Sequence, residues 1–187
     1  MKQKKKNQGK QRRIWKKISS HRIYHCPYIN FYKDRVIDRL GQKTNFYYFK
    51  KGPFVAIVPE DEKGNIYLVR QYRYSIRKQT WELPMGSVHK GESYLQAAKR
   101  ELAEEACLAA KKWTKIGIEH VTATVYPQRF TTFLAQGLKE IDKIPDPAEI
   151  DEVQKFSLRE IEKMIKKNQI VGASVLASFH QYYLHKK

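Results

Sequence analysis

Hydrophobic residues in the first part of the chain fall in short clusters, and these clusters predict β-strands within residues 22–71. Most of these hydrophobic residues are aromatic or β-branched, and turn-forming residues separate their clusters. Two apolar runs, 54–58 and 66–69, flank the polar segment 61–65, which predicts a β-hairpin. A further short strand is predicted over residues 79–83, where a proline ends it.

The middle of the chain changes to helical periodicity. Ser93 followed three residues later by Gln96 matches a capping box, in which each side chain binds the backbone N–H of the other residue. Apolar residues then recur every three or four positions, so we expect a helix from Ser93 to about Cys107. Its predicted apolar stripe consists of Leu95, Ala98, Leu102 and Ala106.

The last part of the chain mixes both patterns. Strands are predicted near residues 113–121 and 130–135, and a loop with two prolines over 143–147. A second capping box opens a predicted helix over residues 157–167, and a final amphipathic helix is predicted over 173–184. Strands with interspersed helices, in a chain without internal repeats, predict a single α/β sandwich.

Composition narrows the class of protein. A chain of 187 residues, 41% hydrophobic and 12% aromatic, is long and apolar enough to bury a core, which excludes a disordered protein. Its two cysteines, Cys26 and Cys107, exclude a disulfide framework and a four-cysteine zinc site. No apolar run reaches the length of a membrane span, and the N-terminus lacks the apolar stretch of a signal peptide. We therefore predict a soluble, cytoplasmic protein.

The chain is strongly basic, because 37 Lys and Arg against 19 Asp and Glu give a net charge of +18. Half of this excess lies in residues 1–20, which carry nine basic residues and no acidic one. We predict that residues 1–13 form a flexible basic tail. Such a tail can bind RNA or anionic lipid, serve as a targeting arm or stay solvated, and the sequence leaves these alternatives open.

Two carboxylates converge on the predicted central helix. Glu101 and Glu105 are four residues apart and therefore lie within roughly 40° of each other around the helix axis. Like charges at this spacing repel, so something positive is expected between them. A hard divalent cation such as Mg²⁺ or Mn²⁺ takes oxygen ligands and meets that requirement. The alternative is a solvated acidic helix face.

The stretch from Gly86 to Leu108 resembles the Nudix box, written G-x5-E-x7-R-E-U-x-E-E-x-G-U, where U is a bulky apolar residue. Cys107 departs from the pattern, because it stands in place of the second glycine. That glycine suits the left-handed conformation that ends the helix, so we expect Cys107 to strain or lengthen the helix end. The residues in register are Gly86, Glu92, Arg100, Glu101, Leu102, Glu104, Glu105 and Leu108.

The resemblance implies a Nudix hydrolase with an α/β/α sandwich and a mixed sheet. Further segments resemble the ADP-ribose pyrophosphatase branch, whose members act on nucleoside diphosphate sugars. This likeness implies a Nudix hydrolase domain at 51–187, preceded by a small β region at 14–50 that is a candidate dimerisation element, and hence a homodimer. The segments that carry the likeness are 15–20, 28–48, 70–74 and 81–86.

The resemblance also implies metal ligands. Glu101 and Glu105 would hold Mg²⁺ or Mn²⁺, helped by the backbone carbonyl of Met85. Glu92 would pair with Arg100 and brace the loop against the helix. The implied catalytic residues are Glu92, Arg100, Glu101, Glu105 and Glu104, the last a further metal ligand.

Substrate contacts follow from the same resemblance. Arg73 would bind the diphosphate, to which a bidentate guanidinium is suited. Arg70 is a further candidate for substrate binding, Glu82 an outer-shell carboxylate, and Tyr28 a ring that stacks an adenine. The implied reaction hydrolyses ADP-ribose to AMP and ribose 5-phosphate.

The sequence leaves the catalytic base and the substrate open. Many ADP-ribose hydrolases carry a catalytic carboxylate on a loop after the box, whereas residues 126–132 contain none. The base is then a carboxylate of the box, Glu119 or a metal hydroxide. The substrate could also be another diphosphate, such as an RNA 5′ end, a dinucleotide or a coenzyme. A non-catalytic Nudix-fold module that binds nucleic acid through its basic tail is the alternative outside the enzyme class.

Overall fold

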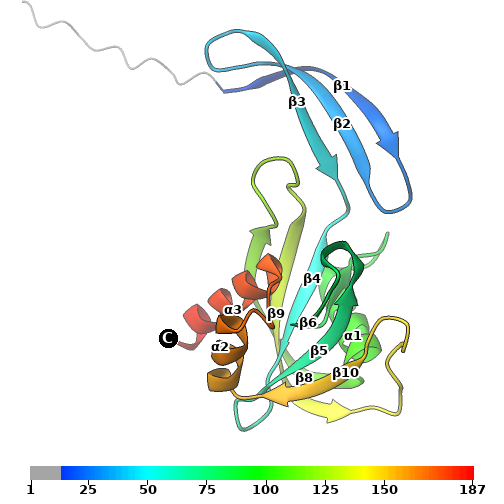
Figure 1. The fold of residues 1–187 in the computed structure, drawn as a ribbon, viewed down its shortest axis with the longest axis vertical. Helices are drawn as coiled ribbons and strands as arrows, with labels where there is room; N and C mark the ends of the chain where they lie inside the picture. The colour runs from blue at the N-terminus through cyan, green and yellow to red at the C-terminus, as the bar shows by residue number, and fades with distance from the viewer. Residues whose placement is uncertain (1–13) are drawn as a thin grey trace, which may run out of the picture. The chain divides into compact units, whose positions relative to one another are not determined.

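The computed structural model describes residues 14–187, which divide into two compact units (Figure 1). The N-terminal unit contains residues 14–51 together with the short segment 124–127. The large unit contains residues 52–123 and 128–187. The prediction for residues 1–13 falls outside the described residues.

The N-terminal unit is a three-stranded antiparallel sheet of β1 (Lys16–His25), β2 (Asn30–Ile37) and β3 (Lys43–Lys50), in that order. The strands predicted from aromatic and β-branched clusters are present here. The β2–β3 turn is closed by Asp38, whose carboxylate accepts hydrogen bonds from the backbone N–H groups of Leu40 and Gln42 at 2.8 and 2.9 Å. In the described residues no helix belongs to this unit, and every residue of β1 is exposed.

The large unit contains two sheets. The four-stranded sheet has the order β7-β4-β9-β8 and is mixed, because β4 and β9 run parallel while the other neighbours are antiparallel. The three-stranded sheet has the order β10-β5-β6 and is antiparallel. The strands are β4 (Phe54–Pro59), β5 (Ile66–Arg73), β6 (Lys78–Glu82), β7 (Met85–Ser87), β8 (Leu108–His120), β9 (Arg129–Glu140) and β10 (Glu152–Phe156).

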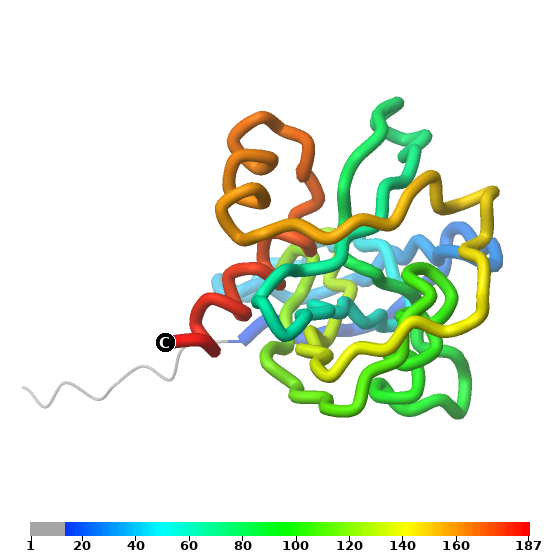
Figure 2. The backbone as a smooth tube through the Cα atoms, turned by 90° about the horizontal axis from the view of Figure 1, so that it is seen from below, coloured from blue at the N-terminus to red at the C-terminus, as the bar shows by residue number. Residues whose placement is uncertain are grey.

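Three helices, α1 (Tyr94–Glu105), α2 (Leu158–Lys166) and α3 (Ala173–Lys186), cover these sheets, and a short 3₁₀ turn spans Tyr74–Ile76. Alternate residues of β4 face different helices: Val55 and Ile57 belong to the core cluster beneath α1, whereas Val58 belongs to the cluster beneath α2 and α3. Figures 1 and 2 show the helices as separate layers around the strands. The predicted α/β sandwich with a mixed sheet is confirmed.

The carboxylate of Glu60 anchors α3 to the end of β4. This side chain is 5% exposed and accepts hydrogen bonds from Tyr182 at 2.8 Å and Gln136 at 2.7 Å, and Lys186 lies 2.7 Å away. Burial by itself would raise the pKa of Glu60, but the bonds from Lys186, Tyr182 and Gln136 outweigh it and lower the pKa. The buried charge is thus fully partnered, as a stable core requires.

Several predictions need correction. Leu95 is 37% exposed, and the buried position on the first turns of α1 is Ala97 instead. Strand β8 begins at Leu108, directly after α1, rather than near residue 113. Strands β7 and β10 were not predicted, because they are short and half polar and show no alternation. No helix between residues 14 and 187 is long and apolar enough to cross a membrane.

Candidate active site

Helix α1 carries the carboxylates of the candidate site and is fixed at both ends. Ser93 Oγ accepts a hydrogen bond from the backbone N–H of Gln96 at 3.2 Å, and the Gln96 side chain accepts one from Ser93 N–H at 2.9 Å. At the other end Ala106 caps the helix, and Cys107 adopts the left-handed conformation with φ of 55°. Cys107 therefore strains the helix end rather than lengthening it.

Glu101 and Glu105 lie on the side of α1 that faces strand β7. They are 7% and 8% exposed, and the backbone N–H of Met85 donates a 2.9 Å hydrogen bond to Glu105 Oε2. A Cβ atom placed on Gly86 would lie 2.1 Å from the carboxyl carbon of Glu101. The glycine is required here because β7 passes directly against this carboxylate.

The environment of the two carboxylates disfavours their ionised form. Burial raises the pKa of Glu105 to about 8; the Met85 N–H opposes the rise and the charge of Glu101 adds to it. Burial raises the pKa of Glu101 as well, although the hydrogen bond from Arg100 acts in the opposite direction. A nearby cation would act in the opposite direction and lower the pKa of both carboxylates.

Arg100 ties the helix to the loop that precedes it. Its guanidinium makes two hydrogen bonds of 3.0 Å to Glu92 and a third of 2.9 Å to the Ser87 carbonyl. Its Nη1 donates to Glu101 at 2.6 Å and to Glu104 at 3.0 Å. The hydrogen bond from Arg100 lowers the pKa of Glu92 to about 2. Arg100 therefore positions the loop and also partly balances the charge of Glu101.

Arg73 is held by Glu82 through a bidentate ion pair. Its Nε and Nη2 donate hydrogen bonds of 2.8 and 2.6 Å to the two carboxylate oxygens of Glu82, which is 6% exposed. These bonds raise the pKa of Arg73, and the charges of Glu105 and Glu149 act on it in the same direction. Arg73 is thus a fixed cation beside the α1 carboxylates.

Arg70 and Tyr28 are the other two residues with an implied substrate role. Arg70 pairs with Glu152 at 3.1 Å and lies over the Trp81 ring at 5.7 Å, so it joins the three strands of the β10-β5-β6 sheet. Tyr28 lies in the turn between β1 and β2 of the N-terminal unit and is 78% exposed. The substrate roles of both residues stay predictions.

The α1 carboxylates offer oxygen atoms of the kind that a divalent cation binds. Within residues 14–187, no three acidic, histidine or cysteine side chains converge into a ready-made metal cluster, and Glu104 is half exposed and bound to Arg100. Glu101 and Glu105 nevertheless offer buried carboxylate oxygens, and the neighbouring cations do not fully balance their negative charge. Oxygen donors of this kind fit Mg²⁺ or Mn²⁺.

Glu119, named above as a candidate base, is bound by a neighbour on strand β9. It accepts a hydrogen bond from Thr132 at 3.3 Å, and Thr132 in turn contacts Ser178 of α3 at 3.0 Å. These residues lie on the α3 face of the β8–β9 pair, whereas the core cluster beneath α1 occupies the other face. This position separates Glu119 from the α1 carboxylates.

Glu149 is a charged neighbour of the site that was missed in the sequence. Its charge raises the pKa of both Glu105 and Arg73, and its own side chain is exposed. The next residue, Ile150, is 6% exposed and fixes the loop in the core beneath α1. The sequence signal that could have revealed Glu149 is the acidic run 146–152. This run follows strand β9 and so lies later in the chain than residues 126–132, where a catalytic carboxylate was expected.

Comparisons with known proteins identify the family of this chain. The family model of the NUDIX domain matches residues 50–179. The ADP-ribose pyrophosphatase of Bacillus subtilis (strain 168) is 28% identical over 160 residues, which cover 84% of this chain and 86% of that protein. The ADP-ribose pyrophosphatase of Mycobacterium tuberculosis (strain ATCC 25618 / H37Rv) is 38% identical over 91 residues, 48% of this chain and 44% of that protein. A crystal structure of an ADP compounds hydrolase is similar with a TM-score of 0.80 at 16% identity, covering 91% of this chain and 93% of the other.

The chain belongs to the Nudix family, because the family model covers more than half of its length. It is an enzyme of that family, a Nudix hydrolase. Within the family it resembles the ADP-ribose pyrophosphatase branch. The likeness to the crystal structure supports the fold, since the sequence identity of that pair is low.

Proposed function

We propose that this chain hydrolyses the diphosphate linkage of ADP-ribose or a related nucleoside diphosphate sugar in a metal-dependent reaction. The products would be a nucleoside monophosphate and a sugar phosphate. The observation that carries the proposal is the pair of buried carboxylates, Glu101 and Glu105, held against strand β7 beside the cation of Arg73. Such a pair has a use in phosphate chemistry and no use in the core of a binding module.

Glu101 and Glu105 would hold Mg²⁺ or Mn²⁺, with Glu104 and the Met85 carbonyl as further ligands. When bound, the cation would neutralise the diphosphate and lower the pKa of a water molecule. Arg100 would keep Glu101 in place through the bonds that tie it to Glu92 and Ser87.

Arg73 would bind and orient the diphosphate, since Glu82 already fixes the direction of its guanidinium. Glu149 would accept the proton of the attacking water, because it is exposed and its charge already acts on Glu105. Tyr28 would stack the adenine, for which its exposed ring is available. The choice of ADP-ribose is supported by the names of two related proteins, both ADP-ribose pyrophosphatases.

We also propose a homodimer formed through the N-terminal unit. One face of its sheet gathers Trp15, Phe46 and Tyr48, whose rings contact one another in two pairs, Trp15–Phe46 and Phe46–Tyr48. Trp15 and Phe46 are 47% and 37% exposed, and an exposed aromatic face of this kind suits association. A cytoplasmic location and a nucleic-acid contact of the tail at residues 1–13 stay predictions.

The substrate is tested by measuring product release from the purified chain with Mg²⁺ or Mn²⁺ and with a chelator. The panel contains ADP-ribose, other nucleoside diphosphate sugars, dinucleotides and RNA with a 5′ diphosphate or cap. We expect turnover of a nucleoside diphosphate sugar that stops with the chelator. Turnover of RNA ends alone would replace the substrate but keep the site, whereas turnover of nothing by folded protein would refute the catalytic proposal.

The role of Glu149 is tested by Glu149→Gln on the substrate identified in this way. We expect the rate to fall by about 10²-fold or more with little change in KM, which is typical of the loss of a general base. Glu162→Gln is a matched control, because it removes the charge of an exposed glutamate on helix α2 that has no proposed role in the site. Equal losses in both variants would contradict the assignment.

A further inference from the structure

The positive charge of the described chain is concentrated in the N-terminal unit. Residues 14–51 carry nine Lys and Arg and two Asp, a net charge of +7 in 38 residues. Residues 52–187 carry 21 Lys and Arg and 17 Asp and Glu, a net charge of +4. The excess of the described residues is therefore a property of the small sheet more than of the catalytic unit.

The two acidic residues of this unit form no ion pair with its described lysines and arginines. Asp34 accepts a 2.5 Å hydrogen bond from Ser20, and Asp38 accepts the backbone N–H groups of the β2–β3 turn. Among the described residues, no ion pair includes a Lys or Arg of the N-terminal unit. These side chains are thus available to an anionic partner.

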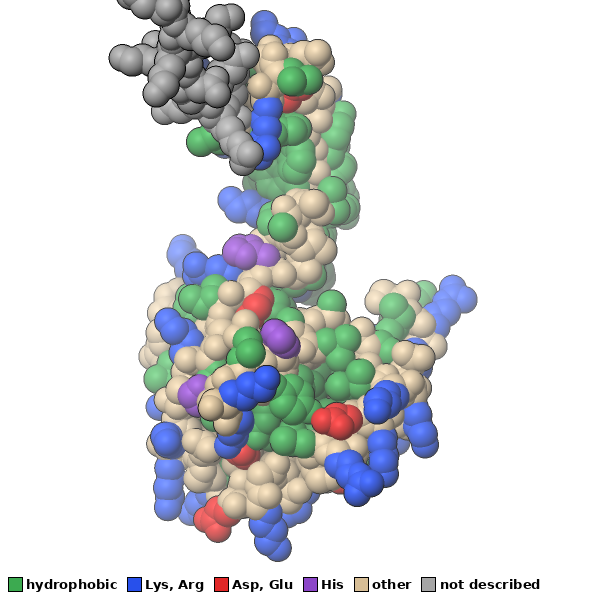
Figure 3. All heavy atoms as spheres, turned by 90° about the vertical axis from the view of Figure 1, so that its left-hand side faces the viewer, with side chains coloured by type: hydrophobic (Ala, Val, Ile, Leu, Met, Phe, Trp, Pro, Cys, Tyr) green, Lys and Arg blue, Asp and Glu red, His purple; other side chains and the backbone are tan. Residues whose placement is uncertain are grey.

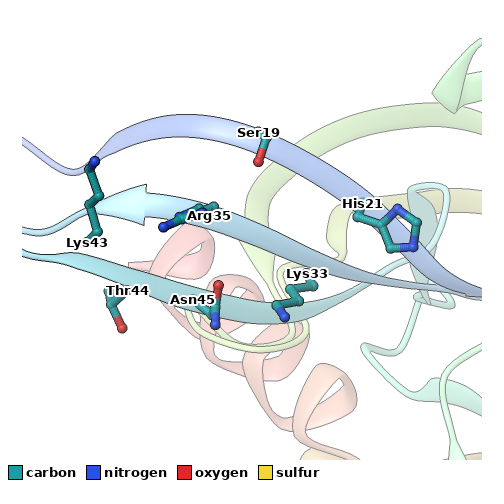
Figure 4. Close-up of a pocket in the computed structure, with 7 residues that line it drawn as sticks. All are labelled: Ser19, His21, Lys33, Arg35, Lys43, Thr44 and Asn45. Carbon is teal, nitrogen blue, oxygen red and sulfur yellow. The ribbon is translucent and has the colours of Figure 1, made fainter.

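One face of the sheet gathers three of these cations around a hollow of about 420 Å³ (Figure 4). Lys33 and Arg35 come from β2 and Lys43 comes from β3. The other residues that line it offer hydroxyl, amide and imidazole groups, and no carboxylate lines it. They are Ser19, His21, Thr44 and Asn45. Cations among neutral donors suit phosphate groups.

Aromatic rings continue the same face. Lys33 is paired with Tyr47 across the strands and its Nζ lies 5.9 Å from the centre of that ring. Phe31 stacks on Tyr47 at 6.1 Å and on Phe49 at 4.7 Å. Tyr47 and Phe49 are 44% and 39% exposed. Figure 3 shows hydrophobic side chains and lysines or arginines together on this unit.

We infer that this face, named here the basic-aromatic face and formed by Lys33, Arg35, Lys43, Tyr47 and Phe49, binds single-stranded nucleic acid. The cations take the backbone phosphates, and the ring of Tyr47 stacks a base. A single strand fits because its bases are free to turn out and stack, whereas those of a duplex are not. A second copy of the chain fits less well, since pairing by symmetry would bring the same cations together.

This inference is independent of the proposed hydrolysis and of the proposed dimer. The aromatic cluster of Trp15, Phe46 and Tyr48 lies on the opposite face of the sheet. The strand register shows this, because Phe46 and Tyr48 pair with Asp34 and Tyr32, whereas Asn45 and Tyr47 pair with Arg35 and Lys33. One face can therefore associate while the other binds a strand.

The test measures the anisotropy of labelled single strands of about twelve nucleotides, one of RNA and one of DNA, and of a duplex of the same length. The full chain is titrated at salt concentrations of roughly 50 to 200 mM. The variant Lys33→Gln/Arg35→Gln/Lys43→Gln is compared with the matched control Lys111→Gln/Lys115→Gln/Lys139→Gln, which removes the same charge from exposed positions of the large unit. Both single strands are included to distinguish RNA from DNA as the source of the ligand.

We expect the triple variant of the basic-aromatic face, called here the face variant, to bind more weakly than the parent. The slope of log Kd against log salt should fall by about 2, since each of the three lost phosphate contacts of a single strand contributes about 0.7. The control should keep the wild-type slope. Tyr47→Leu should weaken binding about tenfold without changing the slope, as a lost stacking contact would. Glu105→Gln should bind strands normally, which separates this site from the catalytic one.

Equal weakening by the face variant and its control would overturn the inference, because the binding would then be a general effect of charge. Binding of the duplex as tightly as the single strands would overturn it too. If Tyr47→Leu binds as tightly as the parent, Tyr47 stacks no base, and the basic-aromatic face as proposed is refuted. Near-ultraviolet circular dichroism, to which the tyrosines and Trp15 of the N-terminal unit contribute, shows whether the mutated sheet remains folded, and helical circular dichroism does the same for the large unit.

Discussion

Replacement of Cys107 by glycine should stabilise the protein. Cys107 has φ of 55°, a left-handed conformation that costs a residue with a side chain roughly 1–2 kcal/mol. Glycine removes this strain but loses about 0.5–1 kcal/mol more backbone entropy on folding. The expected net gain for Cys107→Gly is therefore about 0.5–1 kcal/mol, or about 1–4 °C in Tm for a chain of this size.

The assay is urea unfolding followed by helical circular dichroism, because the helices of the described chain all lie in the large unit. Cys107→Ala is the matched control, since it removes the sulfur and keeps the Cβ atom that causes the strain. We expect the alanine variant to stay within about 0.5 kcal/mol of the parent. A glycine variant no more stable than the alanine variant would refute the reasoning.

Three further predictions concern single side chains. Gly86→Ala should lower activity by about 10²-fold or more and destabilise the protein, because the added Cβ meets the Glu101 carboxylate; unchanged turnover would contradict this contact. Glu60 has a lowered pKa in the folded chain, so its contribution to stability is present above the unfolded pKa near 4.5 and is lost as the pH falls through the folded pKa. Urea unfolding from pH 7 to 3 should show this decline in the free energy of unfolding, and Glu60→Gln should make the decline smaller. Glu82→Gln should raise the KM for the diphosphate substrate several-fold by releasing Arg73, and a KM equal to that of the parent would show that Glu82 does not position it.

Local chemistry explains which parts of the fold could be predicted from the sequence. The capping boxes at Ser93 and Ser157 are satisfied within four residues, so both helix starts were predicted correctly. Strand β10 is short and depends on pairing with β5, which is distant in the chain, so the local pattern does not reveal it. The exposed side of α1 was misassigned at Leu95, since periodicity gives the spacing of a stripe but not its edge.

Some residues of the candidate site could likewise be predicted from the sequence, whereas others depend on tertiary structure. Glu101 and Glu105 are four residues apart on one helix, so their convergence follows from helix geometry alone. Glu149 comes from a loop 44 residues after Glu105, and its approach to the site depends on the burial of Ile150 in the core. The role of Arg70 in joining three strands likewise depends on tertiary pairing, which brings Glu152 and Trp81 beside it.

The distribution of charge was only partly visible in the sequence. The run of basic residues at the N-terminus is obvious, but the hollow of the basic-aromatic face is not. Lys33 and Lys43 become neighbours of one cavity only through the antiparallel register of β2 and β3. Registers of this kind are set by pairing across a turn, which a one-dimensional pattern does not specify.

The most direct test of the central claim compares Glu105→Gln with Glu119→Gln in hydrolysis of ADP-ribose with Mg²⁺. Both variants remove a partly or fully buried carboxylate, but Glu105 faces β7 beside Arg73 whereas Glu119 lies on the α3 face. The account predicts that Glu105→Gln loses at least about 100-fold in kcat while Glu119→Gln stays within about threefold of the parent. Comparable rates for Glu105→Gln and the parent would contradict the assignment of the catalytic site to α1.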